Sequence, residues 1–210
     1  MMKWVYHIRK IFSLIPVSAI PVLLCVLVGC GGSGRIVVSK DLNIPSQTDT
    51  KIPFRVGLKL MPEFTEFVYK PKSNAAPVII GDVLRTGSET VCRNIFDEVV
   101  LIEPPSSRAL QIDVVVIPTC QGVEYHVVDR ATIRVRSRFL WRIMTPDGKE
   151  IYSTTVIGEA VRKVSTTVMA STMEREQGEV YFLSLQDQFR KAQNDLHSGG
   201  WWKNTWWKQP

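Results

Sequence analysis

The residues best suited to chemistry in this sequence are two histidines that each follow an acid by two positions. Glu124 precedes His126, and Asp195 precedes His197. An acid and a histidine could share a proton or begin a metal site, but neither pair has a third or fourth ligand beside it. The sequence also lacks a P-loop, a nucleophile elbow and an HExxH motif. We therefore expect no catalytic residue, no metal and no cofactor, and interpret the protein as a non-enzyme.

Two cysteines in the body of the chain, Cys92 and Cys120, could form a disulfide in an oxidising compartment. The alternative is that both are thiols that pack as small hydrophobic side chains. The sequence leaves both open.

Arginines recur at alternate positions of one stretch. Arg134, Arg136, Arg138 and Arg142 share one face of a predicted strand. Like charges two residues apart repel, so something should offset them. Acidic residues on the neighbouring strands would offset the repulsion, as would burial of the aliphatic part of each arginine side chain against apolar surface. An anionic partner, such as lipid phosphates or an acidic protein face, is the alternative, because arginine binds both bidentately.

The C-terminal segment 198–210 is rich in tryptophan, with Trp201, Trp202, Trp206 and Trp207 in seven residues. Tryptophan beside lysine suits a membrane interface or a groove on a partner. A tail that folds back over the domain is the alternative.

The N-terminal residues follow the order of a secretory signal. Lys3, Arg9 and Lys10 precede an uncharged, mostly apolar run over 11–28, and the small Gly29 follows it. A retained transmembrane helix is the alternative, since the run is marginally long enough to span.

Leu27, Val28, Gly29 and Cys30 resemble the lipobox of bacterial lipoproteins at all four positions. The resemblance implies cleavage before Cys30, diacylation of its thiol and acylation of its new amino group. Several acyl chains would anchor the protein stably in a membrane. Loss of residues 1–29 would lower the formal net charge from +6 to +3, which does not argue for nucleic acid. In enteric bacteria, an aspartate after the cysteine retains a lipoprotein in the inner membrane. Because Gly31 stands at this position, the resemblance implies that the protein is anchored in the outer membrane and faces the periplasm.

Hydrophobic patterns predict the elements that would position these residues. Residues 30–50 are typical of a flexible tether that starts at the lipidated cysteine. Alternation predicts a strand over 52–61, and Asp82 is a plausible N-cap of a helix that runs to about residue 95. Buried strands are expected over 99–102 and 110–117, followed by a turn at Gln121-Gly122.

The strongest pattern is a long hairpin over 131–163 with a turn at 145–149. Residues 165–173 fit either a strand end or a helix start. Spacing of three and four predicts an amphipathic helix over 179–197, ended by Gly199-Gly200. This order predicts one α+β domain over 51–197, with a mostly antiparallel sheet, a long central hairpin and two helices on one face.

This order of elements, together with the lipobox, resembles small lipoproteins that assist envelope assembly and the auxiliary lipoproteins of ABC-type lipid transporters. The resemblance implies a non-enzymatic outer-membrane lipoprotein whose periplasmic domain is an accessory or scaffold in assembly or transport. Its expected partners are the membrane, through Cys30, and another envelope protein. The alternative is a carrier or sensor for a lipid or other amphiphile. A filled core would favour the accessory, and a large apolar cavity the carrier.

Overall fold

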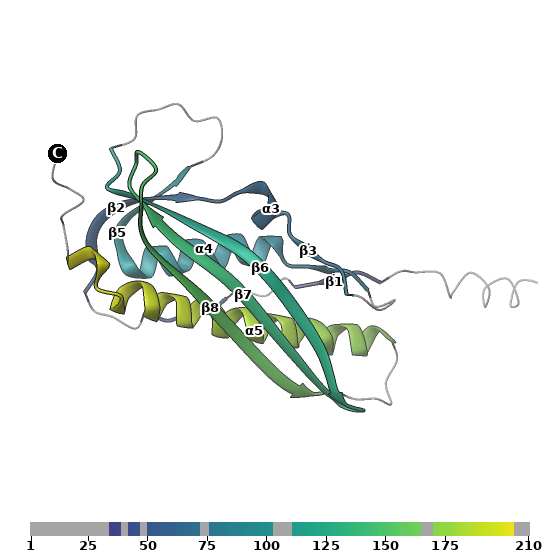
Figure 1. Ribbon diagram of the computed structural model, residues 1–210. Coiled ribbons are helices and arrows are strands. Elements are labelled where there is room, and N and C mark those ends of the chain that lie inside the picture. The colour runs from purple at the N-terminus through teal and green to yellow at the C-terminus, as the bar shows by residue number, and fades with distance from the viewer. Residues whose placement is uncertain are drawn as a thin grey trace, which may run out of the picture. The chain divides into compact units, whose positions relative to one another are not determined.

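Strand β7 (Thr132–Met144) is the strand around which the two layers of the molecule are built (Figure 1). The computed structural model describes residues 34–38, 42–46, 50–71, 76–102, 111–164 and 170–203, the side chains of 170–172 excepted. The main sheet has the order β5-β2-β6-β7-β8, and a small second sheet has the order β1-β4-β3. The α+β class expected from the sequence is confirmed.

The remaining strands and helices have the following bounds. In the main sheet these are β2 (Ile52–Lys59), β5 (Phe96–Ile102), β6 (Val114–Asp129) and β8 (Glu150–Lys163). In the small sheet they are β1 (Ile36–Val37), β3 (Val68–Tyr69) and β4 (Val78–Ile79). The helices are α3 (Pro62–Thr65), α4 (Gly81–Ile95), α5 (Ala170–Ser198) and the 3-10 turn η2 (Trp201–Lys203).

Helices α4 and α5 lie side by side on one face of the main sheet, as Figure 1 shows. Neither they nor any other helix in the described ranges is long and apolar enough to cross a membrane. The residues of β7 that face them are buried without exception: Ile133, Val135, Ser137, Phe139, Trp141 and Ile143. This is the period-two face that the sequence predicted for the hairpin.

The sheet is mixed, which refines the expected mostly antiparallel sheet. β6, β7 and β8 pair antiparallel, but β2 pairs in parallel with both β5 and β6. Parallel neighbours need a long crossover, and the segment that carries α4 supplies it between β2 and β5.

Two local expectations need correction. Gln121-Gly122 is not a turn, because β6 continues through it with a shift in its register against β7 between Cys120 and Gly122. A bulge absorbs one extra residue without ending the strand. Asp82 is not the N-cap of α4; the cap position is Ile80, and Asp82 lies in the first helical turn, where the helix dipole favours a negative charge.

The described part of residues 30–50 is not a flexible tether. Ile36, Val38, Leu42 and Ile44 are all buried in the core. Amide side chains of the two helices hold the backbone here: Asn94 donates to the Ile44 carbonyl at 2.8 Å, and Gln193 donates to the Pro45 carbonyl at 3.1 Å. The packed body therefore begins close to residue 35.

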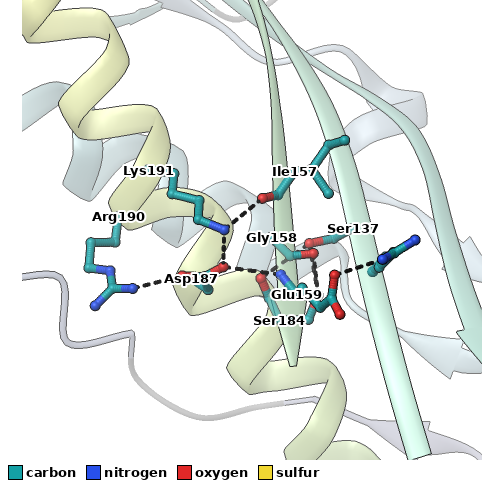
Figure 2. Close-up of polar contacts among 9 residues, drawn as sticks. Ser137, Ile157, Gly158, Glu159, Ser184, Asp187, Arg190 and Lys191 are labelled. Carbon is teal, nitrogen blue, oxygen red and sulfur yellow. Dashed lines mark hydrogen bonds and ion pairs between the residues drawn. The ribbon is translucent and has the colours of Figure 1, made fainter. Parts of the chain in front are cut away.

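The free edge of β8 is covered by side chains of α5 (Figure 2). The Glu159 backbone N–H donates to Asp187 at 3.1 Å, and Lys191 donates to the Ile157 carbonyl at 3.1 Å. Lys191 also pairs with Asp187 at 2.7 Å. Burial alone would raise the pKa of Asp187, but hydrogen bonds from Lys191, the Glu159 N–H and Arg190 outweigh it and lower that pKa. The edge groups are thereby withheld from pairing with another strand.

Gly158, between these two edge residues, lets β8 and α5 approach closely. A Cβ at this position would collide with the Ser184 carbonyl and with the backbone of Gln188. The Ser184 hydroxyl donates to the Gly158 carbonyl at 3.2 Å and lies 3.0 Å from the Ser137 hydroxyl (Figure 2). Because residue 158 has no side chain, α5 comes close enough for the Ser184 hydroxyl to form these buried polar contacts with β7 and β8.

Candidate functional site

The face of the main sheet that points away from α4 and α5 is the candidate site, and we call it the outer face. Its centre is the row of arginines on β7 that alternate with the buried residues. Cross-strand pairing sets their neighbours: Arg136 lies between Glu124 of β6 and Glu159 of β8, and Arg138 lies between Gly122 and Ile157.

Half of the arginine row is paired with one cross-strand acid. Glu159 lies between two arginines, with its carboxylate 3.2 Å from Arg134 Nε and 2.8 Å from Arg136 Nε. The Arg136 contact is also a hydrogen bond. The structure therefore provides the cross-strand acid that the first interpretation of the arginine row required.

The other half of the row carries charge without an acid. Arg138 is exposed and Arg142 half-buried, and neither forms an ion pair with any residue that the structure describes. Arg142 lies between Ile117 and Ser153, which cannot offset its charge. The exposed guanidinium of Arg138 is thus available to a carboxylate or phosphate from outside, whereas the Nε of Arg142 is buried.

A shallow hollow of about 260 Å³ lies beside Arg138. Gly122, beside the bulge in β6, borders the hollow, and a Cβ at this position would meet no atom within 4 Å. The exposed Ile157 forms one wall, and charged side chains form the others. The lining residues are Gln121, Gly122, Glu124, Arg136, Arg138, Ile157 and Glu159. The hollow combines an apolar wall with a free guanidinium, which suits a protruding side chain of a partner.

Two further hollows lie elsewhere on the described surface. One, of about 250 Å³, lies at the ends of β2 and β5 with Glu66 and Arg85 among its lining residues. The other, of about 300 Å³, lies between residues 43–45 and α5. Between sheet and helices the core is filled by large side chains, Phe139, Trp141 and Phe189 among them.

The structure brings together one of the two acid–histidine pairs and not the other. His126 Nε2 lies 3.6 Å from Glu124 at the exposed end of the outer face. His197 contacts the Thr50 carbonyl at 3.3 Å instead of Asp195. Among the residues that the structure describes, no three side chains of His, Cys, Asp or Glu are grouped as metal ligands.

Cys92 and Cys120 are free thiols, so the disulfide is not formed. Cys92 is fully buried on α4, and burial raises its pKa to about 12. Cys120 lies on β6, where burial likewise raises its pKa to about 11. The two occupy different layers, and each packs as the small hydrophobic side chain of the second interpretation.

Trp201 belongs to the core and not to an exposed tail. It is 6% exposed, and its ring packs against Phe54, Phe96 and Tyr152. Trp202 is half-buried and donates to the His197 carbonyl at 3.1 Å. This part of the segment folds back on the domain. Trp206 and Trp207 lie outside the described residues, as do Leu27, Val28, Gly29 and the lipidation candidate Cys30.

A cluster of three tyrosines lies near the end of the long hairpin, and no pattern in the sequence indicated it. Tyr69, Tyr125 and Tyr181 come together from β3, β6 and α5, with ring centroids 5.9 and 6.0 Å apart. Burial raises the pKa of all three hydroxyls. They are spread over more than a hundred residues, so no local spacing could have indicated the cluster.

No protein-family model matches this sequence, and no curated protein matches it either. Among solved structures, a minor lipoprotein from Acinetobacter baumannii is 9% identical with a TM-score of 0.45, covering 71% of this chain and 95% of that one. The rare lipoprotein B from Shewanella oneidensis is 10% identical with a TM-score of 0.42, covering 74% and 99%. At such identity and TM-scores, neither protein's name says what this chain does.

Proposed function

We propose that this chain is a non-enzymatic lipoprotein of the bacterial outer membrane, anchored through an acylated Cys30. Its periplasmic domain would act as an accessory to another envelope protein in assembly or transport. The lipobox resemblance of Leu27 to Cys30 supports the anchor. The layout of the domain supports the accessory role.

The outer face is the observation that carries the proposal. Helices cover one face of the sheet, while the other presents Arg138 and Arg142 without acids and a hollow walled by Ile157. Arginine pairs bidentately with carboxylates, and an exposed apolar side chain beside it gains by being covered. The favoured partner is therefore an envelope protein with an acidic surface.

The packing of the core favours an accessory over a carrier. A site for an amphiphile usually encloses several hundred cubic ångströms of apolar space. Here Phe139 lies 5.8 Å from Phe189 and 5.7 Å from Phe64, ring centre to ring centre, in the layer where such a ligand would lie. Native mass spectrometry of the purified protein tests the carrier directly, since a bound lipid would add its mass.

A photo-crosslinking residue at position 157 tests the proposed interface in whole cells. Ile157 is 42% exposed on the outer face, on the edge strand β8. The matched control is position 93 on α4, where the Arg93 side chain is 60% exposed on the helical layer. We expect a crosslinked envelope protein from 157 and none from 93, and the adduct should weaken when Arg138→Gln is added.

The anchor is tested in the same cells with Cys30→Ser and an acyl analogue. The wild-type chain should incorporate the analogue and the variant should not. Equal labelling of the two would refute the anchor. Equal crosslinking from 157 and 93 would refute the outer face as the interface and leave the anchor standing.

A further inference from the structure

Strands β6 and β7 form a second hairpin, whose tip is the turn at residues 130–131 and which carries exposed apolar side chains near that tip. Val127 is 64% exposed and Val128 is 51% exposed, and Val161 of β8, two residues before that strand's last position, is 52% exposed. Val127 and Val128 lie near the end of β6, just before Asp129, and no described element packs over them. Val127 pairs with Ile133 of the inner face and Val161 with Arg134 of the outer face, so this end of the sheet exposes apolar side chains on both of its faces.

Two cations lie beside these valines. Arg130 in the turn and Lys163 at the end of β8 are exposed, and Lys163 is close enough to Asp129 to help lower the pKa of that carboxyl. Asp129, the last residue of β6, accepts a hydrogen bond from the Ala131 N–H at 2.9 Å, which lowers its pKa and holds the turn. Exposed apolar side chains with cations beside them fit the boundary between acyl chains and phosphate headgroups.

One turn of α5 joins this tip region to the start of the packed chain. Gly178 packs against Ile36 of β1, and its neighbours Gln177 and Glu179 contact Tyr125 at 3.5 Å and Arg162 at 2.6 Å. Tyr125 and Arg162 lie only two residues and one residue from the exposed Val127 and Val161. The end of the domain where the chain enters is therefore the end that carries the tip.

The distance from the anchor is short. Ile36 already belongs to β1, so the chain between Cys30 and Arg35 is too brief to be the long tether expected from the sequence. Five residues reach at most ~18 Å when fully extended. An acylated Cys30 would hold this end of the domain against the headgroups.

We infer that the β6–β7 tip, through Val127, Val128 and the cations beside them, contacts the surface of the bilayer in which the acyl chains of Cys30 are inserted. This inference rests on the lipid anchor of the proposed function. The protein then meets the membrane at two places, the anchor and the tip, and the second contact fixes how the domain is oriented.

An environment-sensitive fluorophore at position 128 tests the contact. The mature, acylated Val128→Cys chain is labelled with a thiol-reactive dye and reconstituted into vesicles of phosphatidylethanolamine and phosphatidylglycerol. Cys92 and Cys120 have raised pKa values, so at neutral pH they form little thiolate and label poorly. The matched control is Glu150→Cys, an exposed position beside the turn between β7 and β8. It lies at the other end of β7, about 40 Å away for a strand of that length.

In vesicles we expect the dye at 128 to shift to the blue and to be shielded from iodide, while the dye at 150 keeps its aqueous spectrum. Equal, aqueous spectra in a protein that floats with the vesicles would overturn the tip contact and leave the anchor intact. A blue shift at 128 without vesicles would mean that the tip packs on protein, which also overturns it. A chain without acyl groups by mass spectrometry would refute the anchor and the tip contact together.

Discussion

The two faces of β7 are made by adjacent residues and obey different rules. On the inner face, Phe139 and Trp141 meet Phe189 at ring distances of 5.8 and 6.3 Å and are fully buried. On the outer face, Arg136 pairs with Glu159 at 2.8 Å while Arg138 has no acid. The shape and volume of the side chains constrain which residues fit the inner face, because these residues must fill a closed space. On the outer face the charges of the side chains matter more, and the positive charge there is only partly balanced.

Phe139→Ala should have the largest effect on folding. The phenyl ring fills the space between Phe64 and Phe189, so its removal leaves a cavity and should lower the free energy of unfolding by about 3–5 kcal/mol. Urea denaturation measures the change. The control is Leu140→Ala, the next residue, which is half-buried on the outer face. Similar losses for the two variants would mean that the outer face is also packed.

Gly158→Ala tests the close approach of β8 to α5. The new Cβ would collide with backbone atoms of Ser184 and Gln188, so the helix must move, at a loss of about 1–3 kcal/mol. Gly122→Ala is the matched control on the outer side of the sheet, where a Cβ meets nothing. Its effect should stay within about 0.5 kcal/mol. Equal melting temperatures of the two variants would contradict the close approach.

Low pH should weaken the contact between the free edge of β8 and α5, and so lower the free energy of unfolding. The pKa of Asp187 is lowered in the folded protein, so its contribution to stability is complete above its ordinary pKa of 3.8 and is lost as the pH falls through the lowered value. Asp187→Asn removes this titration. The free energy of unfolding of the variant should therefore fall less between pH 5 and 2, a range set by the ordinary carboxyl pKa of ~4.

Asp129 and Asp147 also have lowered pKa values and remain in the Asp187→Asn variant. Some loss of stability in acid is therefore expected in both proteins, and the difference between the two curves is the quantity to measure. Superimposable curves would show that Asp187 does not hold the edge.

The smallest effect on folding is expected for Arg136→Gln with Arg138→Gln. Arg136 forms an exposed ion pair and Arg138 forms none, and such groups contribute roughly 0–1 kcal/mol to stability. If the outer face binds an acidic partner, the same double variant should weaken binding and flatten its dependence on salt. Arg93→Gln on α4 is the control for lost surface charge. A large drop in melting temperature with unchanged binding would mean that the arginines are structural.

The long hairpin and its two faces could be predicted because the signal is local. Alternation from Ile133 to Ile143 requires only that successive side chains point to opposite faces, and the structure buries that face throughout. The same pattern placed the four arginines on one side. Whether an acid would lie opposite each arginine depended on the register between the strands, which the sequence did not give. In the structure the register of β7 and β8 places Glu159 opposite Arg136.

Features that depend on distant parts of the chain could not be read from the sequence. Ile36 and Ile44 stand among polar residues that suggested a tether, and their burial comes from α5, far along the chain. Trp201 stands in a segment that resembled an exposed tail, but Phe54 and Phe96 form a site for its ring. Spacing along the chain carries no information about such partners.

The position of β2 sets the order in which the sheet can be completed. β6, β7 and β8 pair with their neighbours along the chain, so they can close with short loops and little loss of entropy. β2 lies between β5 and β6, both of which come later in the chain. During export from the N-terminus, as proposed, β2 crosses the membrane before either of its partner strands. Its apolar residues Phe54, Val56 and Leu58 then stay uncovered until β5 and β6 follow, and such exposed surface favours aggregation.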